Sequence, residues 1–269
     1  MAAAIAVYLA ELGWPVVLVS ADTRSSLGTI LNEEIGYDES AGLKRLGETE
    51  QYKGLRLGVI KESPYFDNIP GTPLMKAMMR LIAQQDRPTY LVIDAPPTGN
   101  LIKNLNTSLP SDDFIWEIIY KINLWQLKRK GKAGVVKYLE DKREAFVKGL
   151  NIMRWPNTIT IPVTLPTESA LIGTNNLISE LYQLEVHPYN VLLEDDYTIK
   201  DTETGKVYDF TKPVIVNRVT GNSNINKIKE YFPSPEYKTT IVPELDEEPI
   251  GRKALSKLGR MLFKGIKSF

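Results

Sequence analysis

Short apolar runs alternate with helical patterns along this chain, and this alternation limits the possible folds more than any other feature. Each run is rich in β-branched residues and bounded by turn residues, as strands buried on both faces usually are. The runs span residues 16–19, 55–60, 90–94, 158–165, 213–219 and 239–243. The helical patterns span residues 5–12, 73–85, 168–184, 225–232 and 250–269. This order predicts an α/β fold with a doubly wound, mostly parallel sheet.

Composition excludes several classes of function. Lys plus Arg equals Asp plus Glu at 33 each, so no nucleic-acid partner is expected from overall charge. The absence of cysteine excludes disulfides, thiolate metal sites and cysteine nucleophiles. His187 is the single histidine, and we interpret it as structural. No apolar run approaches the roughly 18 residues of a membrane span, and the start lacks a signal peptide's basic flank. We therefore expect a cytoplasmic protein.

Two stretches interrupt the alternation. Residues 112–155 are almost wholly helical in pattern and far longer than a crossover between strands needs. They predict a helical subdomain inserted into an α/β core of residues 1–111 and 156–269. Residues 192–210 predict a hairpin, because Tyr197 and Ile199 alternate with polar residues and Thr204-Gly205 supplies a turn.

Two aspartates stand at the ends of predicted strands. Asp94 ends the strand in the segment YLVIDAPPTGN, and Asp22 ends VVLVSAD. Ligands of open α/β sheets bind at the carboxyl ends of the strands. Two such carboxylates suit one magnesium-assisted phosphate site, in which one orients the metal and the other the attacking water. The alternative is structural, with each side chain capping the turn or helix that follows its strand.

These segments resemble a known family. VVLVSADTRSSL is similar to the first switch of the ArsA ATPases, and DAPPTGN is similar to their second switch. VTLPTESAL, VIVNRV and VPELDEEPIG resemble three further stretches of the family in the same order. The resemblance covers nearly the whole chain and implies a P-loop NTPase-like fold of the deviant Walker A class. The family includes arsenite-pump ATPases and the ATPase that delivers tail-anchored membrane proteins.

The resemblance implies ATP and Mg²⁺ as cofactors. By the match of the first switch, Asp22 would be the carboxylate that activates water. By the match of the second, Asp94 would hold Mg²⁺ through water and Gly99 would sense the γ-phosphate.

The same resemblance implies a site for the adenine base. Asn217 of VIVNRV would read the base beside Arg218. Pro243 and Glu244 would line it.

The largest departure from the family lies at the start of the sequence. Family members begin with a strand and a Gly-Lys-Gly-Gly-x-Gly-Lys-Thr loop, and MAAAIAVYLAELG looks like the helix after that loop. No substitute for the phosphate-binding loop is evident elsewhere. Three explanations for the absence of the loop are an upstream start, a truncated form and a true degenerate paralogue. We favour a full-length ATPase whose first strand and phosphate-binding loop are not part of this sequence. Because the phosphate-binding loop is absent, we expect hydrolysis to fail in the chain as written. Thr23, Arg24, Ser25 and Asn100 also replace family residues in the switches, which bears on the geometry of the switches and on the rate of hydrolysis.

The predicted helix at residues 112–127 is apolar on nearly all sides, so it buries both faces or offers one to a partner. By the family resemblance, Phe114, Trp116, Ile118 and Trp125 would line a groove for a client. Packing inside the subdomain is the alternative.

Two functions follow as hypotheses. The first is a Mg-ATP-driven homodimer switch that acts on a hydrophobic protein client or a membrane-associated partner. Because cysteine is absent, we expect neither a zinc site nor a response to metalloid in this protein. The second is a non-catalytic pseudo-ATPase interaction module, which would bind a protein partner through the helical insert.

Overall fold

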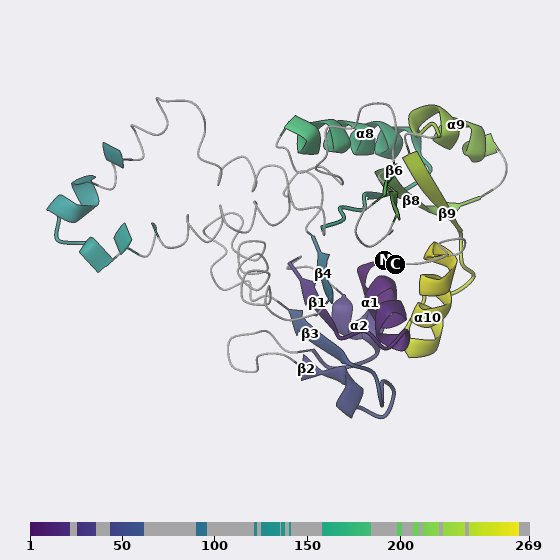
Figure 1. The fold of residues 1–269 in the computed structure, drawn as a ribbon, viewed down its shortest axis with the longest axis horizontal. Coiled ribbons are helices and arrows are strands. Elements are labelled where there is room, and N and C mark those ends of the chain that lie inside the picture. The colour runs from purple at the N-terminus through teal and green to yellow at the C-terminus, as the bar shows by residue number, and fades with distance from the viewer. Residues whose placement is uncertain are drawn as a thin grey trace.

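In the computed structural model of this chain, two sheets and the helices packed on them make up most of the described residues (Figure 1). The structure describes residues 1–21, 26–35, 44–61, 90–95, 121–122, 125–134, 136–137, 140, 158–183, 198–200, 207–209, 212–220, 223–234 and 237–263. The helix predicted at 73–85 and the turn Thr204-Gly205 lie outside this set, as does His187.

The first sheet has four strands in the order β2-β3-β1-β4. They are β1 (Val16–Ser20), β2 (Lys44–Arg45), β3 (Leu57–Lys61) and β4 (Tyr90–Asp94). β1 runs parallel to β3 on one side and to β4 on the other, whereas β2 is antiparallel to β3. Every residue of β1 is buried. This central position explains why its sequence is a continuous apolar run rather than an alternating one.

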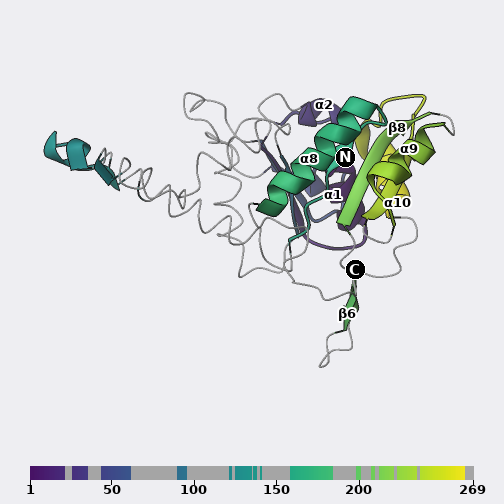
Figure 2. The same cartoon turned by 90° about the horizontal axis from the view of Figure 1, so that it is seen from above.

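The second sheet has three parallel strands in the order β5-β8-β9. They are β5 (Val163–Thr164), β8 (Lys212–Val219) and β9 (Tyr237–Pro243). A separate antiparallel hairpin pairs β6 (Thr198–Lys200) with β7 (Val207–Asp209), and Figure 2 shows β6 projecting from the body. The predicted α/β class with mostly parallel strands is confirmed, with the strands divided between two sheets.

The strand predicted at residues 158–165 is wrong in length. Only Val163–Thr164 is a strand, because Pro162 and Pro166 flank it and have no N–H to donate to a neighbouring strand. The carbonyl of Pro162 still accepts a hydrogen bond from the Ile215 N–H at 3.0 Å. Proline thus limits β5 to a short strand at the edge of its sheet.

The described helices cover the two sheets. They are α1 (Ala2–Glu11), α2 (Leu27–Leu31), α8 (Glu168–Gln183), α9 (Ser223–Tyr231) and α10 (Gly251–Leu262), with a short 3₁₀ helix η1 (Leu46–Glu48). α8 and α9 lie over the second sheet (Figure 2), where Leu171 and Ile228 share a buried cluster with Val216. α1 and α10 share another buried cluster with residues of both sheets, among them Leu18 and Ile215. This common core joins the two sheets into one body.

α1 ends at Glu11, and the chain reverses at Gly13. Gly13 has a φ of +91°, a conformation that glycine adopts without steric cost. Its N–H bonds the carbonyl of Ala10 at 3.0 Å, and the N–H of Trp14 bonds the carbonyl of Leu9 at 3.3 Å. This pair of bonds is a Schellman motif, which satisfies the last carbonyls of the helix and turns the chain toward β1.

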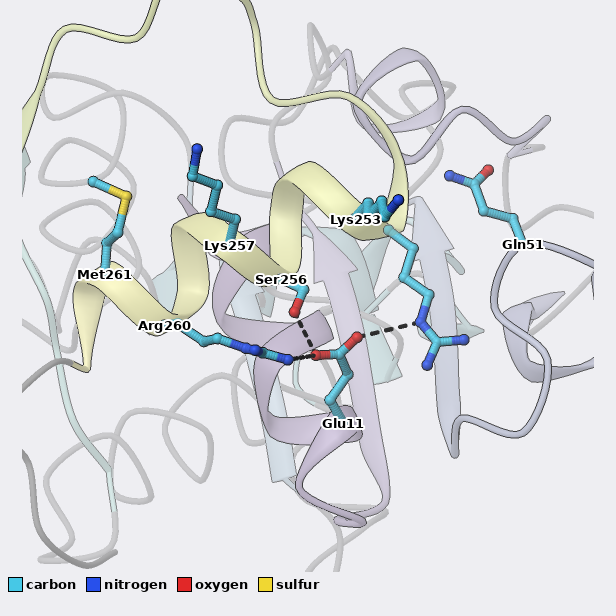
Figure 3. A pocket seen from close by; sticks show the side chains of 8 residues that line it. Glu11, Gln51, Lys253, Ser256, Lys257, Arg260 and Met261 are labelled. Atoms are coloured by element: carbon cyan, nitrogen blue, oxygen red, sulfur yellow. Dashed lines mark hydrogen bonds and ion pairs between the residues drawn. The ribbon is translucent and has the colours of Figure 1, made fainter.

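One carboxylate, Glu11, ties α1 to α10 (Figure 3). It contacts the Arg252 Nε at 3.3 Å and the Arg260 Nη2 at 3.4 Å, and it accepts a hydrogen bond from the Ser256 hydroxyl. Partial burial alone would raise the pKa of Glu11, but the hydrogen bonds from Ser256, Arg252 and Arg260 outweigh it and lower the pKa below its ordinary value of 4.5. The ionised form of Glu11 is therefore favoured in the folded protein.

We expect the Glu11→Gln variant to lose about 1 kcal/mol of unfolding free energy at pH 7. The loss is modest because solvent around the exposed Arg260 screens its interaction with Glu11. A lowered folded pKa stabilises the fold above the unfolded pKa, and that contribution is lost as pH falls through the folded pKa. The difference between Glu11→Gln and wild type should therefore shrink below a pH of about 4.5. Urea unfolding at neutral and acid pH measures it. Glu180→Gln, on the exposed side of α8, is the control, and an equal loss in both variants would contradict the role of Glu11.

Candidate functional site

The first part of the site lies where β1 and β4 end. The two strands are in register, with Ser20 opposite Asp94, and the Ala21 N–H donates to the Asp94 carbonyl oxygen at 2.9 Å. Asp94 is half-buried as the last residue of β4. Asp22 lies outside the described residues, but it directly follows Ala21 in the sequence. The backbone thus brings the segment before Asp22 next to Asp94, as the sequence predicts.

The start of α1 is close enough to Asp94 for the charges of the two groups to interact. Burial lowers the pKa of the Met1 amine, and the negative charge of Asp94 opposes part of this effect. The first N–H groups of a helix form a partly positive end that favours anions. A helix start and a carboxylate therefore meet at the carboxyl end of the sheet, the place where ligands of α/β proteins bind. No local sequence pattern indicates that Met1 and Asp94 lie near each other, because only the fold brings these two residues together.

The second part of the site lies where β8 and β9 end. The register of the two strands shifts between Val216 and Val219, where Val219 pairs with Pro243. Arg218 sits in this irregularity with a φ of +56°, which is uncommon for a residue other than glycine. The Asn217 Oδ1 accepts a hydrogen bond from the Arg218 N–H at 3.0 Å. The backbone at this point is thereby held in a strained shape of the kind found at binding sites.

The irregularity also holds the predicted base-binding residues together. The Glu244 N–H bonds the Val219 carbonyl at 3.4 Å, so the segment after Pro243 stays against the end of β8. Asn217 is half-buried, whereas Arg218 and Glu244 are exposed. Within the described part of the chain, the Asn217 Nδ2 makes no hydrogen bond, so it can donate one to a ligand.

The described contacts form two groups of predicted residues rather than one. Asp94 belongs to the group at β1 and β4, and Asn217, Arg218, Pro243 and Glu244 form the group at β8 and β9. Among the described residues, no hydrogen bond or ion pair joins the two groups. Gly99, Phe114, Trp116 and Ile118 lie outside the described residues, like Asp22.

Trp125 is the one residue of the predicted client groove that the structure describes. Its side chain is 56% exposed, and the Arg129 guanidinium lies 5.0 Å from the centre of its ring. The residues described around it are helical at 125–129 and turn at 130–131. The surface at Trp125 is therefore open to solvent among the described residues, while the groove itself and the boundaries of the insert stay predictions.

The described residues were compared with the requirements of a metal site and of a membrane-spanning helix. They hold no group of three or more His, Cys, Asp or Glu side chains arranged for a metal ion. Mg²⁺ often keeps several waters and binds through one or two carboxylates plus phosphate oxygens, so the single carboxylate of Asp94 fits that mode. No helix within the described ranges has both the length and the hydrophobicity to cross a bilayer.

Comparison with known proteins gives relatives of one kind. The chain is 24% identical over 96% of its length to an arsenical pump-driving ATPase of Escherichia coli, and 25% identical over 96% to one of Acidiphilium multivorum. It covers 41% of each of these two proteins. A putative arsenical pump-driving ATPase 2 of Aquifex aeolicus is 22% identical over 96% of the chain, which covers 93% of that protein. No family model matches the chain.

Proposed function

We propose that this chain is an ATPase of the ArsA type, like the proteins it resembles, that it binds Mg-ATP at the carboxyl ends of its strands and that it uses the nucleotide to drive a homodimer switch. The observation that carries this proposal is the position of Asp94, at the end of β4 and beside the start of α1. The relatives are named as pump-driving ATPases, and in the two longer ones this chain covers only about two fifths of the protein. The activity of the whole protein is therefore part of the proposal.

The phosphates would lie between Asp94 and the start of α1. The N–H groups of the first turn favour negative oxygens, and Asp94 would hold Mg²⁺ through water. Bound Mg²⁺ supplies charge neutralisation on the phosphate oxygens. What this chain contributes is the fixed position of the carboxylate, because β4 is paired along its length with buried β1. Asp22 is proposed to orient and deprotonate the attacking water, and Gly99 to respond to the γ-phosphate.

The adenine base would lie at the ends of β8 and β9. The Nδ2 of Asn217 can donate to a ring nitrogen, since its Oδ1 is engaged by the Arg218 N–H. Pro243 and Glu244 lie against this position through the pairing of Pro243 with Val219. The strained Arg218 backbone would set the direction of the amide, which is a common reason for such strain at a binding site.

Two edge strands of the described sheets have room for further pairing. In the described part of the chain, β4 and β5 are each hydrogen-bonded on one side only, and Val163 and Leu165 beside that open edge are exposed. Exposed apolar residues on a parallel edge favour pairing with a further strand.

Partner binding is the second part of the proposed function. Ile122 and Trp125 are exposed in the helical insert, and exposed apolar side chains of this kind suit a hydrophobic protein client or a membrane-associated partner. We propose that the ATP-bound and ATP-free dimers present this surface differently.

Sedimentation velocity tests the switch. We expect the full-length protein to change its sedimentation coefficient when magnesium and ATP are added together, and to keep it unchanged when EDTA is also present. Asn217→Ala should weaken the response by raising the ATP concentration that is needed, whereas Asn224→Ala on α9 is the control. An identical profile with and without Mg-ATP would contradict the proposal and favour the pseudo-ATPase module, whose partner binding needs no nucleotide.

A further inference from the structure

α10 carries a concentration of positive charge on a chain whose net charge is zero. Leu255, Leu258 and Leu262 of this helix are buried, so its basic residues face the other way. Lys253, Lys257 and Arg260 are exposed, and Arg252 is half-buried. Positive charge is therefore concentrated on one face of α10, although the net charge of the whole chain is zero.

These side chains line a pocket of about 850 Å³ beside Glu11 (Figure 3). Its lining residues are Glu11, Gln51, Arg252, Lys253, Ser256, Lys257, Arg260 and Met261. Four of them are cationic and one is anionic, which leaves a net lining charge of +3. The volume lies in the range of pockets that bind small molecules, roughly 300–1,000 Å³.

Glu11 neutralises only part of this charge. It pairs with Arg252 and Arg260, and it accepts a hydrogen bond from the Ser256 hydroxyl (Figure 3). Figure 3 shows Lys253 and Lys257 directed away from Glu11. In the described part of the chain, neither lysine makes a hydrogen bond or an ion pair. Two ammonium groups therefore remain available to an anion.

The pocket is separate from the proposed nucleotide site. Glu11 is the last residue of α1, and Met1, which lies next to Asp94, directly precedes its first residue. A helix of ten residues separates the two ends, which corresponds to about 15 Å. An anion in this pocket would thus contact α10 and the end of α1 rather than Asp94.

We propose that this pocket binds a multivalent phosphate group, held by Lys253 and Lys257. A phosphate monoester carries close to two negative charges at neutral pH, which a lining charge of +3 can neutralise. Lysine binds phosphate as a point charge. The Gln51 amide adds a neutral donor on the pocket wall. The phosphate comes from a soluble phosphorylated compound or from the headgroup of an anionic lipid, which presents the same chemistry.

The test uses two probes on the whole protein. Calorimetric titration with inorganic tripolyphosphate measures binding of a soluble anion. Co-sedimentation with phosphatidylcholine vesicles that contain phosphatidic acid, compared with vesicles of phosphatidylcholine alone, measures binding of a lipid headgroup. The variant is Lys253→Glu with Lys257→Glu, and both side chains are exposed, so the fold should persist. The control with the same change in charge is Lys137→Glu with Lys229→Glu, which are exposed elsewhere.

We expect the pocket variant to bind at least one probe about tenfold more weakly than wild type, because two charge-assisted contacts are replaced by repulsion. The control should change by less than about twofold. Glu11→Gln should act in the opposite direction and tighten binding, since it removes the one negative charge of the pocket. If the pocket variant binds tripolyphosphate more weakly than wild type, the ligand is a soluble phosphate compound. If only its binding to the vesicles is weakened, the ligand is a lipid headgroup. Binding equal in wild type and both double variants, or absent for both probes, would overturn the proposal.

Discussion

The Gly259→Val variant is expected to lose about 3 kcal/mol of unfolding free energy, the largest stability effect that we predict for a single substitution in this chain. Gly259 lies in α10 where that helix crosses α1. A Cβ at this position would lie 2.5 Å from the Tyr8 Cβ and 2.7 Å from the Ala4 carbonyl oxygen. Real Cβ contacts are not this short, and the nearest atoms belong to backbone and to the base of a side chain. The helices would therefore have to separate.

Separation of α1 from α10 would weaken more than one contact. The two helices share the buried cluster that joins both sheets, and the rings of Tyr8 and Phe263 stack with centroids 5.0 Å apart. The interaction of Glu11 with Arg252 depends on the same approach. A displacement of α10 at Gly259 would thus disturb the buried core, the stacked rings of Tyr8 and Phe263, and the interaction of Glu11 with Arg252.

A matched control is available in α8. Gly173 is exposed in the interior of that helix, and a Cβ there would meet no atom within 4 Å. The Gly173→Val change should alter the free energy of unfolding by less than about 0.5 kcal/mol, because only helix propensity is involved. Urea unfolding monitored by far-ultraviolet circular dichroism measures both variants. A loss for Gly259→Val no larger than that of the control would show that α1 and α10 do not need the close approach.

The strands were largely predictable because their sequence pattern is local. β4 has the predicted bounds of Tyr90–Asp94, since a short apolar run between polar residues leaves little choice of ends. α8 begins at the predicted Glu168 and is helical through Gln183, and the last residue of the prediction, 184, lies outside the described residues. α9 begins at Ser223, two residues before its predicted start. Such differences at element ends are expected, because end residues fray and carry weak sequence signals.

Features that depend on distant residues were not predictable. Glu11 is separated from Arg252 by 241 positions in the sequence, so no local pattern indicates that they meet. The division of the strands into two sheets depends on which edges pair, and periodicity alone does not determine this. The positive φ of Arg218 had no sequence signal, since glycine or asparagine would be the ordinary choice for that conformation.

The candidate site was predictable in part for the same reason. Asp94 could be assigned to the carboxyl end of a strand from its local sequence, and the structure places it there. The proximity of Met1 to Asp94 required the fold, because it depends on how α1 packs on β1 and β4. The contact between Glu244 and Val219 likewise depends on the parallel pairing of β8 with β9. The residue type at each strand end could be read from the local sequence, whereas the residues that the fold brings next to it could not.

The Asp94→Asn variant of the full-length protein is expected to hydrolyse ATP at least about a hundredfold more slowly than wild type, under the proposed function. Asparagine keeps the shape of the side chain and removes its negative charge, so the backbone bond from Ala21 to position 94 should persist. Mg²⁺ prefers charged carboxylate oxygens, and the neutral amide would hold the metal's waters poorly. The loss should therefore appear in the metal-dependent part of nucleotide binding as well as in the rate.

Fluorescence titration with an ATP analogue, with magnesium and again with EDTA, separates these effects. Wild type should bind the analogue more tightly with magnesium, and Asp94→Asn should show the same weaker affinity in both conditions. Glu230→Gln, an exposed carboxylate-to-amide change on α9, should behave as wild type. Thermal unfolding of all three proteins checks that the fold is retained, because Asp94 also lies beside the Met1 amine. If Asp94→Asn kept the full magnesium-dependent gain in affinity, Asp94 would not be the residue that holds the metal, and the end of β4 would have a structural role only.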